Sequence, residues 1–200
     1  MSKLKSLLLL LGGTWAASHL GAVYAPIPEQ EQGKDFSASV RVGVAHDSNI
    51  FGAATGAVSS SVYTVEPSLK FNTSLTDQTF FSASYRLTLD RMEDRPGDQT
   101  LDSHDLNVRL AHAFSQATNI DVSDNYTVSK NPESLLAGIP LNTDQSFKRN
   151  QVDGRLVTTL GERVSATFKA RSVHYRYDNA TLGASLDRTE TLAGAAVTYT

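Results

Sequence analysis

Charged side chains recur at alternate positions in this chain, a spacing that suits the lining of a water-filled barrel. On one parity lie the cations Arg41, Lys70, Arg86, Arg109, Arg155, Lys169 and Arg171 and the acids Glu66, Asp90, Asp105, Asp121 and Asp153. The slight cationic excess favours anionic solutes such as acidic saccharides, as charged rings do in pores. The alternative is a lumen whose charged side chains neutralise one another in ion pairs. Both interpretations fit the sequence.

Histidines and acidic loops give no spacing typical of a metal centre or a hydrolase. The chain contains His19, His46, His104, His112 and His174. His104 and His112 share a parity but are too far apart for one ion, and no cysteine supports the others. Nothing in the spacing favours a Ser-His-Asp triad. Residues 94–102 and 142–144 have oxygen ligands that suit Ca²⁺, as ordinary polar loops also do. We therefore expect no enzyme, no catalytic residue, no metal and no cofactor.

Eight segments position these charges by alternating apolar with polar residues, which predicts strands with one face of each kind. The segments span residues 36–45, 63–75, 81–90, 105–114, 120–128, 152–160, 164–171 and 191–199. The fifth is weaker, because Asp124 stands on its apolar parity. No segment after residue 30 has a helical period, so the sequence predicts an all-β chain.

Short and long connections alternate along the chain, as expected for an up-and-down antiparallel meander. Outer-membrane barrels have this asymmetry, with short periplasmic turns and longer outside loops. The predicted strands are long enough to cross a membrane at a tilt, and aromatic residues lie near the ends of their apolar faces. The sequence thus favours a transmembrane β-barrel. A secreted β-sandwich and a lipocalin-like barrel with inward apolar residues are the alternatives.

The N-terminal residues 1–25 have the basic, apolar and small-residue order of a secretory signal peptide, although a buried helix is the alternative. Cleavage after Ser18, Ala22 or Ala25 remains open. A polar linker spans residues 26–34, and the barrel is expected over residues 35–200. Removing Lys3 and Lys5 with the signal peptide takes the formal net charge from −3 to about −5, so a nucleic-acid partner is not expected. Without cysteine, stability must come from the sheet and its surroundings.

The stretch His46-Asp47-Ser48-Asn49-Ile50-Phe51 ends the first predicted strand. Asp and Asn side chains cap turns, and Phe51 is expected to fold its ring back on the barrel rim. Together with Thr64-Val65-Glu66-Pro67-Ser68-Leu69, this stretch resembles the β-barrel porin type 2 family, with His46 in place of the usual Tyr. The resemblance implies a Gram-negative outer-membrane barrel without catalytic residues, often encoded beside exopolysaccharide export or exosortase systems.

The sequence therefore predicts a porin-like channel or an exopolysaccharide-linked export component in the Gram-negative outer membrane. A non-conducting structural or adhesin-type barrel, whose outside loops bind a partner, is the alternative. Expected partners are outer-membrane lipids, the barrel-assembly machinery and an anionic saccharide. The eight strands are expected to be the N-terminal part of a larger barrel, because complete barrels usually finish on an aromatic residue. A closed eight-stranded barrel remains the alternative.

Overall fold

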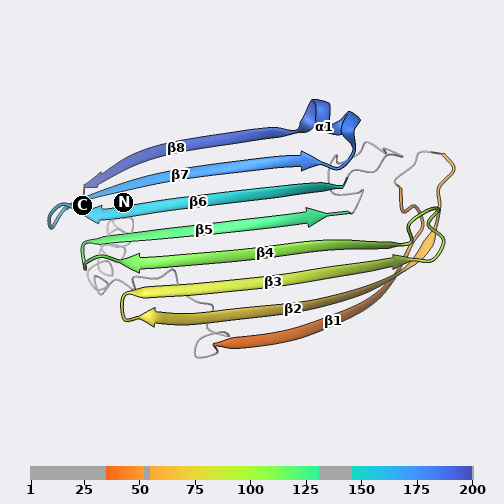
Figure 1. The fold of residues 1–200 in the computed structure, drawn as a ribbon, viewed down its shortest axis with the longest axis horizontal. Helices are drawn as coiled ribbons and strands as arrows, with labels where there is room; N and C mark the ends of the chain where they lie inside the picture. The colour runs from red at the N-terminus through yellow and green to blue at the C-terminus, as the bar shows by residue number, and fades with distance from the viewer. Residues whose placement is uncertain (1–34, 52–54, 131–145, 200) are drawn as a thin grey trace, which may run out of the picture.

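The computed structural model describes residues 35–51, 55–130 and 146–199, which form one eight-stranded antiparallel sheet in the order β1-β2-β3-β4-β5-β6-β7-β8 (Figure 1). The strands are β1 (Phe36–Asp47), β2 (Ser60–Thr76), β3 (Thr79–Met92), β4 (Thr100–Ala113), β5 (Thr118–Ser129), β6 (Phe147–Thr159), β7 (Val164–Tyr177) and β8 (Arg188–Tyr199). The predicted signal peptide, the linker and the acidic stretch 142–144 lie outside the described residues.

All eight predicted strands are confirmed, together with the all-β up-and-down topology. Most strands extend further toward the long loops than the alternation indicates. β6 begins at Phe147 rather than near residue 152, and β7 continues to Tyr177. Phe114 and Leu160 lie in turns rather than in strands, because β4 ends at Ala113 and β6 at Thr159.

Within the described residues one short helix, α1 (Ala180–Leu186), lies in the long connection between β7 and β8, although the sequence has no helical period there. Asn179 caps it, because the Asn179 Oδ1 accepts hydrogen bonds from the backbone N–H groups of Thr181 (2.9 Å) and Leu182 (3.2 Å). α1 has no buried residue. A helix this short, without an apolar stripe, leaves no periodic signal in the sequence.

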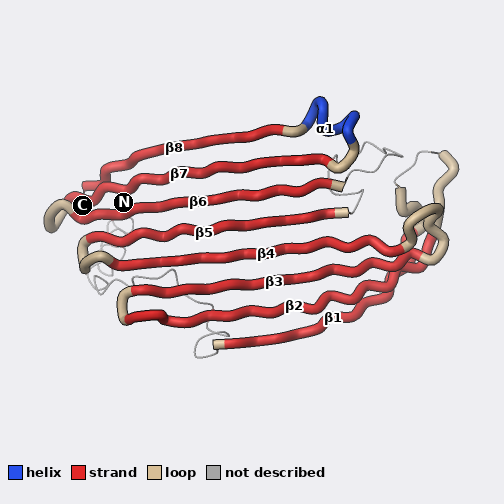
Figure 2. Tube along the Cα trace, in the orientation of Figure 1, coloured by secondary structure: helices blue, strands red, loops and turns tan. Residues whose placement is uncertain are grey.

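The predicted alternation of connections is confirmed. Segments 77–78, 114–117 and 160–163 join strands at one end of the sheet, whereas 48–59, 93–99, 130–146 and 178–187 join them at the other (Figure 2). These are called the short-turn end and the long-loop end. In an up-and-down meander, successive connections lie at opposite ends of the sheet. Because long and short connections alternate, all the long ones lie at the same end.

The strand register separates two faces. The row Ala38, Leu69, Tyr85, Leu106, Tyr126, Asn150, His174 and Thr189 crosses all eight strands and lies on the face called apolar. The opposite face, called polar, carries the alternate positions. Asp124 lies opposite Val108 on the apolar face, as the parity predicts, and accepts a hydrogen bond from the Asn150 side chain (2.6 Å).

Burial is the reverse of that in a soluble sheet. Exposed large apolar side chains lie mostly on the apolar face, where Val42 is 73% and Val197 72% exposed. Two small buried groups lie instead on the polar face or against it. Ile50, Met92 and Leu101 pack together at the long-loop end, and Phe80 lies opposite Ala111, both buried, near the short-turn end.

The sheet is open, because β1 pairs only with β2 and β8 only with β7 among the described residues. Closure into a barrel therefore stays a prediction.

Candidate functional site

All the charged residues predicted to line a lumen lie on the polar face. The register places there Arg41, Lys70, Arg86, Arg109, Arg155, Lys169, Arg171, Glu66, Asp90, Asp105, Asp121 and Asp153. Because paired residues in an antiparallel sheet share a face, strict alternation within each strand is enough to bring these side chains together.

Most of these charges pair across neighbouring strands. Arg41 contacts Glu66 (3.2 Å), Arg86 contacts Asp105 (3.0 Å), and Arg171 contacts Asp153 (2.6 Å). Each of these pairs is directly opposite in register. Such exposed ion pairs contribute about 0–1 kcal/mol each in water, so their main effect is to hold the side chains in one arrangement.

Arg109 and Asp121 form a forked pair between β4 and β5. The Arg109 Nε donates to both carboxylate oxygens of Asp121 (2.9 and 3.1 Å), and Nη2 donates to Oδ2. A bidentate guanidinium–carboxylate pair is the strongest geometry of this kind. Nearer the long loops, the Thr64 hydroxyl donates to Asp90 (2.5 Å).

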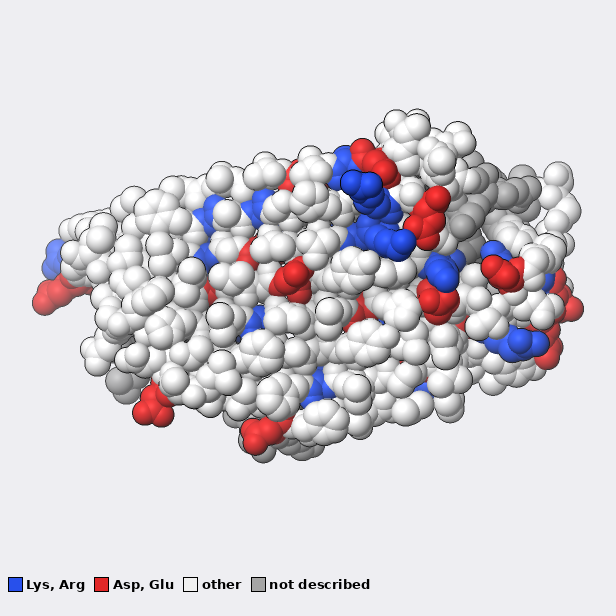
Figure 3. Space-filling model, in the orientation of Figure 1, with Lys and Arg blue, Asp and Glu red and all other residues white. Residues whose placement is uncertain are grey.

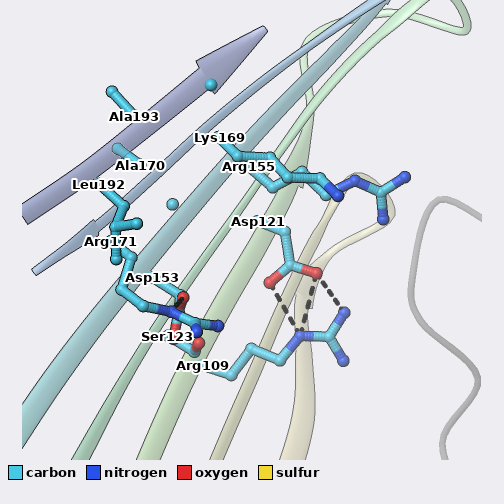
Figure 4. Close-up of a pocket in the computed structure, with 12 residues that line it drawn as sticks. Arg109, Asp121, Ser123, Asp153, Arg155, Lys169, Ala170, Arg171, Leu192 and Ala193 are labelled. Carbon is cyan, nitrogen blue, oxygen red and sulfur yellow. Dashed lines mark hydrogen bonds and ion pairs between the residues drawn. The ribbon is translucent and has the colours of Figure 1, made fainter. Parts of the chain in front are cut away.

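The polar face of the described sheet is indented by hollows, of which two contain the predicted lumen charges. One, of about 600 Å³, lies over β1–β4, where Arg41, Glu66, Lys70, Arg86 and Asp105 contribute its charges. The other, of about 560 Å³, lies over β4–β8 and is drawn in Figure 4. Its charged side chains are Arg109, Asp121, Asp153, Arg155, Lys169 and Arg171.

Sequence reasoning missed an aromatic and arginine cluster on the polar face near the long loops. Both the Arg188 guanidinium (3.9 Å) and that of Arg149 (5.8 Å) lie over the ring of Tyr175. Phe147 packs near Tyr175 and Tyr177, with ring centroids 6.5 and 6.1 Å apart. Arg149 has the parity of Arg155, so extending the sixth segment back to residue 147 would have found it.

The motif at the end of β1 has a structural role. The Asp47 Oδ1 accepts a hydrogen bond from the Asn49 N–H (2.8 Å), the expected capping turn, and the Ile50 N–H donates to the Val58 carbonyl (2.9 Å). Ile50 is only 2% exposed and is the main anchor, whereas Phe51 is half-buried beneath Arg95. The motif thus fixes the first long loop against β3 and β4.

His104, His112 and His174 each have their own hydrogen-bond partners and do not meet. The His104 Nε2 bonds Asp102 (2.9 Å), and its Nδ1 bonds the Tyr85 hydroxyl (2.7 Å) on the neighbouring strand. Asp102 also contacts the Lys130 ammonium (2.7 Å) and raises the pKa of that lysine above its usual range through this hydrogen bond. This series of side-chain contacts, from Tyr85 to Lys130, was not apparent from the sequence, because Tyr85 comes from another strand.

Two further histidines have similar explanations, and His19 lies outside the described residues. His112 bonds the Thr79 hydroxyl (2.8 Å), and His174 bonds that of Thr189 (3.0 Å). Within residues 35–51, 55–130 and 146–199, no group of three or more His, Asp or Glu side chains is arranged to hold a metal ion. This region includes the acidic segment 94–102.

In comparisons with known proteins, no family model, no curated protein and no solved structure matches the chain. The resemblance to the β-barrel porin type 2 family therefore stays a prediction. None of the helices in the described residues is long and apolar enough to cross a membrane. The fold places the described residues in the class of all-β proteins, with one antiparallel up-and-down sheet.

Proposed function

We propose that this chain is a Gram-negative outer-membrane β-barrel that acts as a porin-like channel or an exopolysaccharide-linked export component. The observation that carries the proposal is the exposed apolar face of the sheet. Val40, Val42, Val44, Val65, Leu69, Leu106, Leu110 and Val197 are among its exposed side chains. An apolar surface spread over eight strands is unusual on a soluble monomer and is typical of contact with lipid or a partner.

The direction of the apolar band favours contact with lipid over contact with a flat partner protein. On β1 the apolar stretch is centred at Val40, two residues toward the long loops from the row of Ala38. On β8 it is centred near Ala196, seven residues toward the short turns from Thr189 in the same row. The same row is apolar on β1–β5 but carries Asn150, His174 and Thr189 on β6–β8.

The band therefore crosses the strands obliquely. A shift of about nine residues is ~30 Å at ~3.3 Å per residue, over seven strand spacings that total ~34 Å. This corresponds to an angle of about 40°, within the tilt of roughly 35–45° that strands of membrane barrels adopt. In Figure 3 charged side chains gather near the long-loop ends of the strands, and the region toward the short turns is largely white.

Strand length and loop asymmetry support the same proposal. The strands contain 12 to 17 residues, more than the roughly 9–11 needed to cross the hydrocarbon layer at a tilt. The short turns would face the periplasm and the long loops the outside, as in outer-membrane barrels.

A non-conducting structural or adhesin-type barrel is the second candidate. Apolar groups at both ends of the polar face, around Ile50 and around Phe80, and the cross-strand ion pairs favour it. In a barrel of eight strands, interior side chains of this kind fill the lumen.

The experiment is refolding of the purified protein from urea into detergent, followed by gel mobility with and without heating and by single-channel recording in planar bilayers. A heat-modifiable band with stepwise conductance supports the channel. A heat-modifiable band without conductance favours the structural barrel. A monodisperse protein that stays folded in water without detergent would exclude both.

A further inference from the structure

We infer that the hollow over β4–β8 contains a binding site for an oxyanion, formed by Arg155 and Lys169. This inference rests on the proposed function in one respect, because solutes reach the polar face through the barrel interior. The ligand class is a solute that carries a carboxylate, sulfate or phosphate group.

The first observation is an unbalanced pair of cations. Arg155 on β6 and Lys169 on β7 lie directly opposite each other in register. Like charges in this position are destabilising, and within the described part of the chain neither forms an ion pair or hydrogen bond. The opposed pairs Arg41–Glu66, Arg86–Asp105 and Arg171–Asp153 are all of opposite sign.

The second observation is that the nearby carboxylates are already engaged. Asp121 lies opposite Arg155 in register, but both of its oxygens accept hydrogen bonds from Arg109. Asp153 accepts from Arg171 (2.6 Å) and from the Gln151 amide (2.5 Å). Figure 4 shows Arg155 and Lys169 extending side by side, while the Asp121 oxygens face Arg109. The hollow therefore has two positive charges that its own acids do not neutralise.

The third observation is space beside the cations. Gly194 on β8 lies opposite Lys169 in register and so faces the same hollow. A Cβ added there would meet nothing within 4 Å. The missing side chain leaves room for a ligand in the hollow beside Lys169. An oxyanion held there would receive the planar fork of Arg155 on one side and the mobile point charge of Lys169 on the other.

The test is isothermal titration of the refolded full chain in detergent with sodium glucuronate and with sodium sulfate, and with glucose as the uncharged probe. Saturable binding of either anion, with none for glucose, is the expected result. The two anions distinguish a carboxylate ligand from a tetrahedral one. Because each solvent-reachable charged contact contributes a few-fold in affinity, Arg155→Gln with Lys169→Gln should weaken binding by about tenfold.

The matched control is Lys148→Gln with Arg176→Gln. These two cations are also opposed on β6 and β7, but they lie on the apolar face, so their removal subtracts the same charge from the same strand pair without touching the hollow. Oxyanion affinity should stay within twofold of the original. Equal weakening in both double variants would show only a general charge effect and would overturn the site.

A second variant keeps the inference testable if the double variant fails to refold. Gly194→Glu places a carboxylate beside Lys169 and Arg155, where it should compete with the free anion and abolish saturable binding. Unchanged binding in this variant would also overturn the site. Failure of the channel proposal is seen separately, as loss of heat-modifiability and conductance in the unsubstituted protein, whereas binding in detergent is measured directly.

Discussion

Replacing Val42 with Arg tests whether the apolar face contacts lipid. Val42 lies near the centre of the band on β1, is 73% exposed and has Val65 directly opposite. Val40 and Val44 flank it on the same face, so no acidic side chain adjoins it on β1. Near the midplane of a membrane an outward Arg costs about 2–4 kcal/mol. On a surface in water the same change is usually within about 0.5 kcal/mol.

The structure also decides which companion substitutions are informative. Val108 has a similar place on β4 but lies opposite Asp124 on the same face. Val108→Arg would gain a carboxylate partner, so its cost should be smaller than that of Val42→Arg. On the polar face, Arg41→Gln removes the exposed ion pair with Glu66 and should cost no more than about 1 kcal/mol.

The assay is urea unfolding of the protein in lipid vesicles, followed by far-ultraviolet circular dichroism and by gel mobility without heating. The expected order of destabilisation is Val42→Arg, then Val108→Arg, then Arg41→Gln. Equal costs for Val42→Arg and Arg41→Gln would refute lipid contact at this face. So would a Val42→Arg protein that remains folded and monodisperse without detergent.

Topology and loop anchoring give two further predictions. Single cysteines at Thr55, Gly97, Gly138 or Gly183 should react with an impermeant thiol reagent on intact cells, whereas cysteines at Asp77, Gln116 or Glu162 should not; the reverse labelling would invert the proposed orientation. Ile50→Ala removes the anchor buried against Met92 and Leu101 and should lower the free energy of unfolding by about 2–4 kcal/mol. Phe51→Ala is its control, expected to cost less because Phe51 is only half-buried, and equal costs in thermal unfolding would contradict Ile50 as the main anchor.

Strand existence and facing were predictable from sequence because both follow from a period of two. The parity of Arg41 or Lys169 within its strand decides its face, whatever the exact strand ends are. Strand ends were harder to predict. Toward the long loops the apolar face becomes polar, as at Asn150 and His174, so alternation of hydropathy stops before the hydrogen-bonded ladder does.

Interactions between strands could not be predicted from parity alone. The Tyr85–His104 contact and the Arg109–Asp121 fork depend on register, which the turns fix and which a sequence pattern leaves open. The role of Ile50 depends on apolar residues on the polar parity at the strand ends, Met92 and Leu101. Those residues are visible in the sequence, but alternation treats them as exceptions rather than as a small core.

Among the described residues, β1 and β8 form the unpaired edges of the sheet, and how these edges are paired decides between the competing functions. In hydrocarbon each unsatisfied backbone group costs several kcal/mol, so β1 and β8 cannot keep free edges in the proposed membrane form. Both have 12 residues, and an even meander makes them antiparallel to each other, so direct pairing would close a small barrel. Its interior would be filled by the ion pairs and the groups around Ile50 and Phe80, and the Arg155–Lys169 site would then be internal. Pairing through additional strands would widen the lumen and make the same two cations part of a channel wall. The number of strands thus determines whether the polar face acts as a filled core or as a pathway for anions, and single-channel conductance measures that difference.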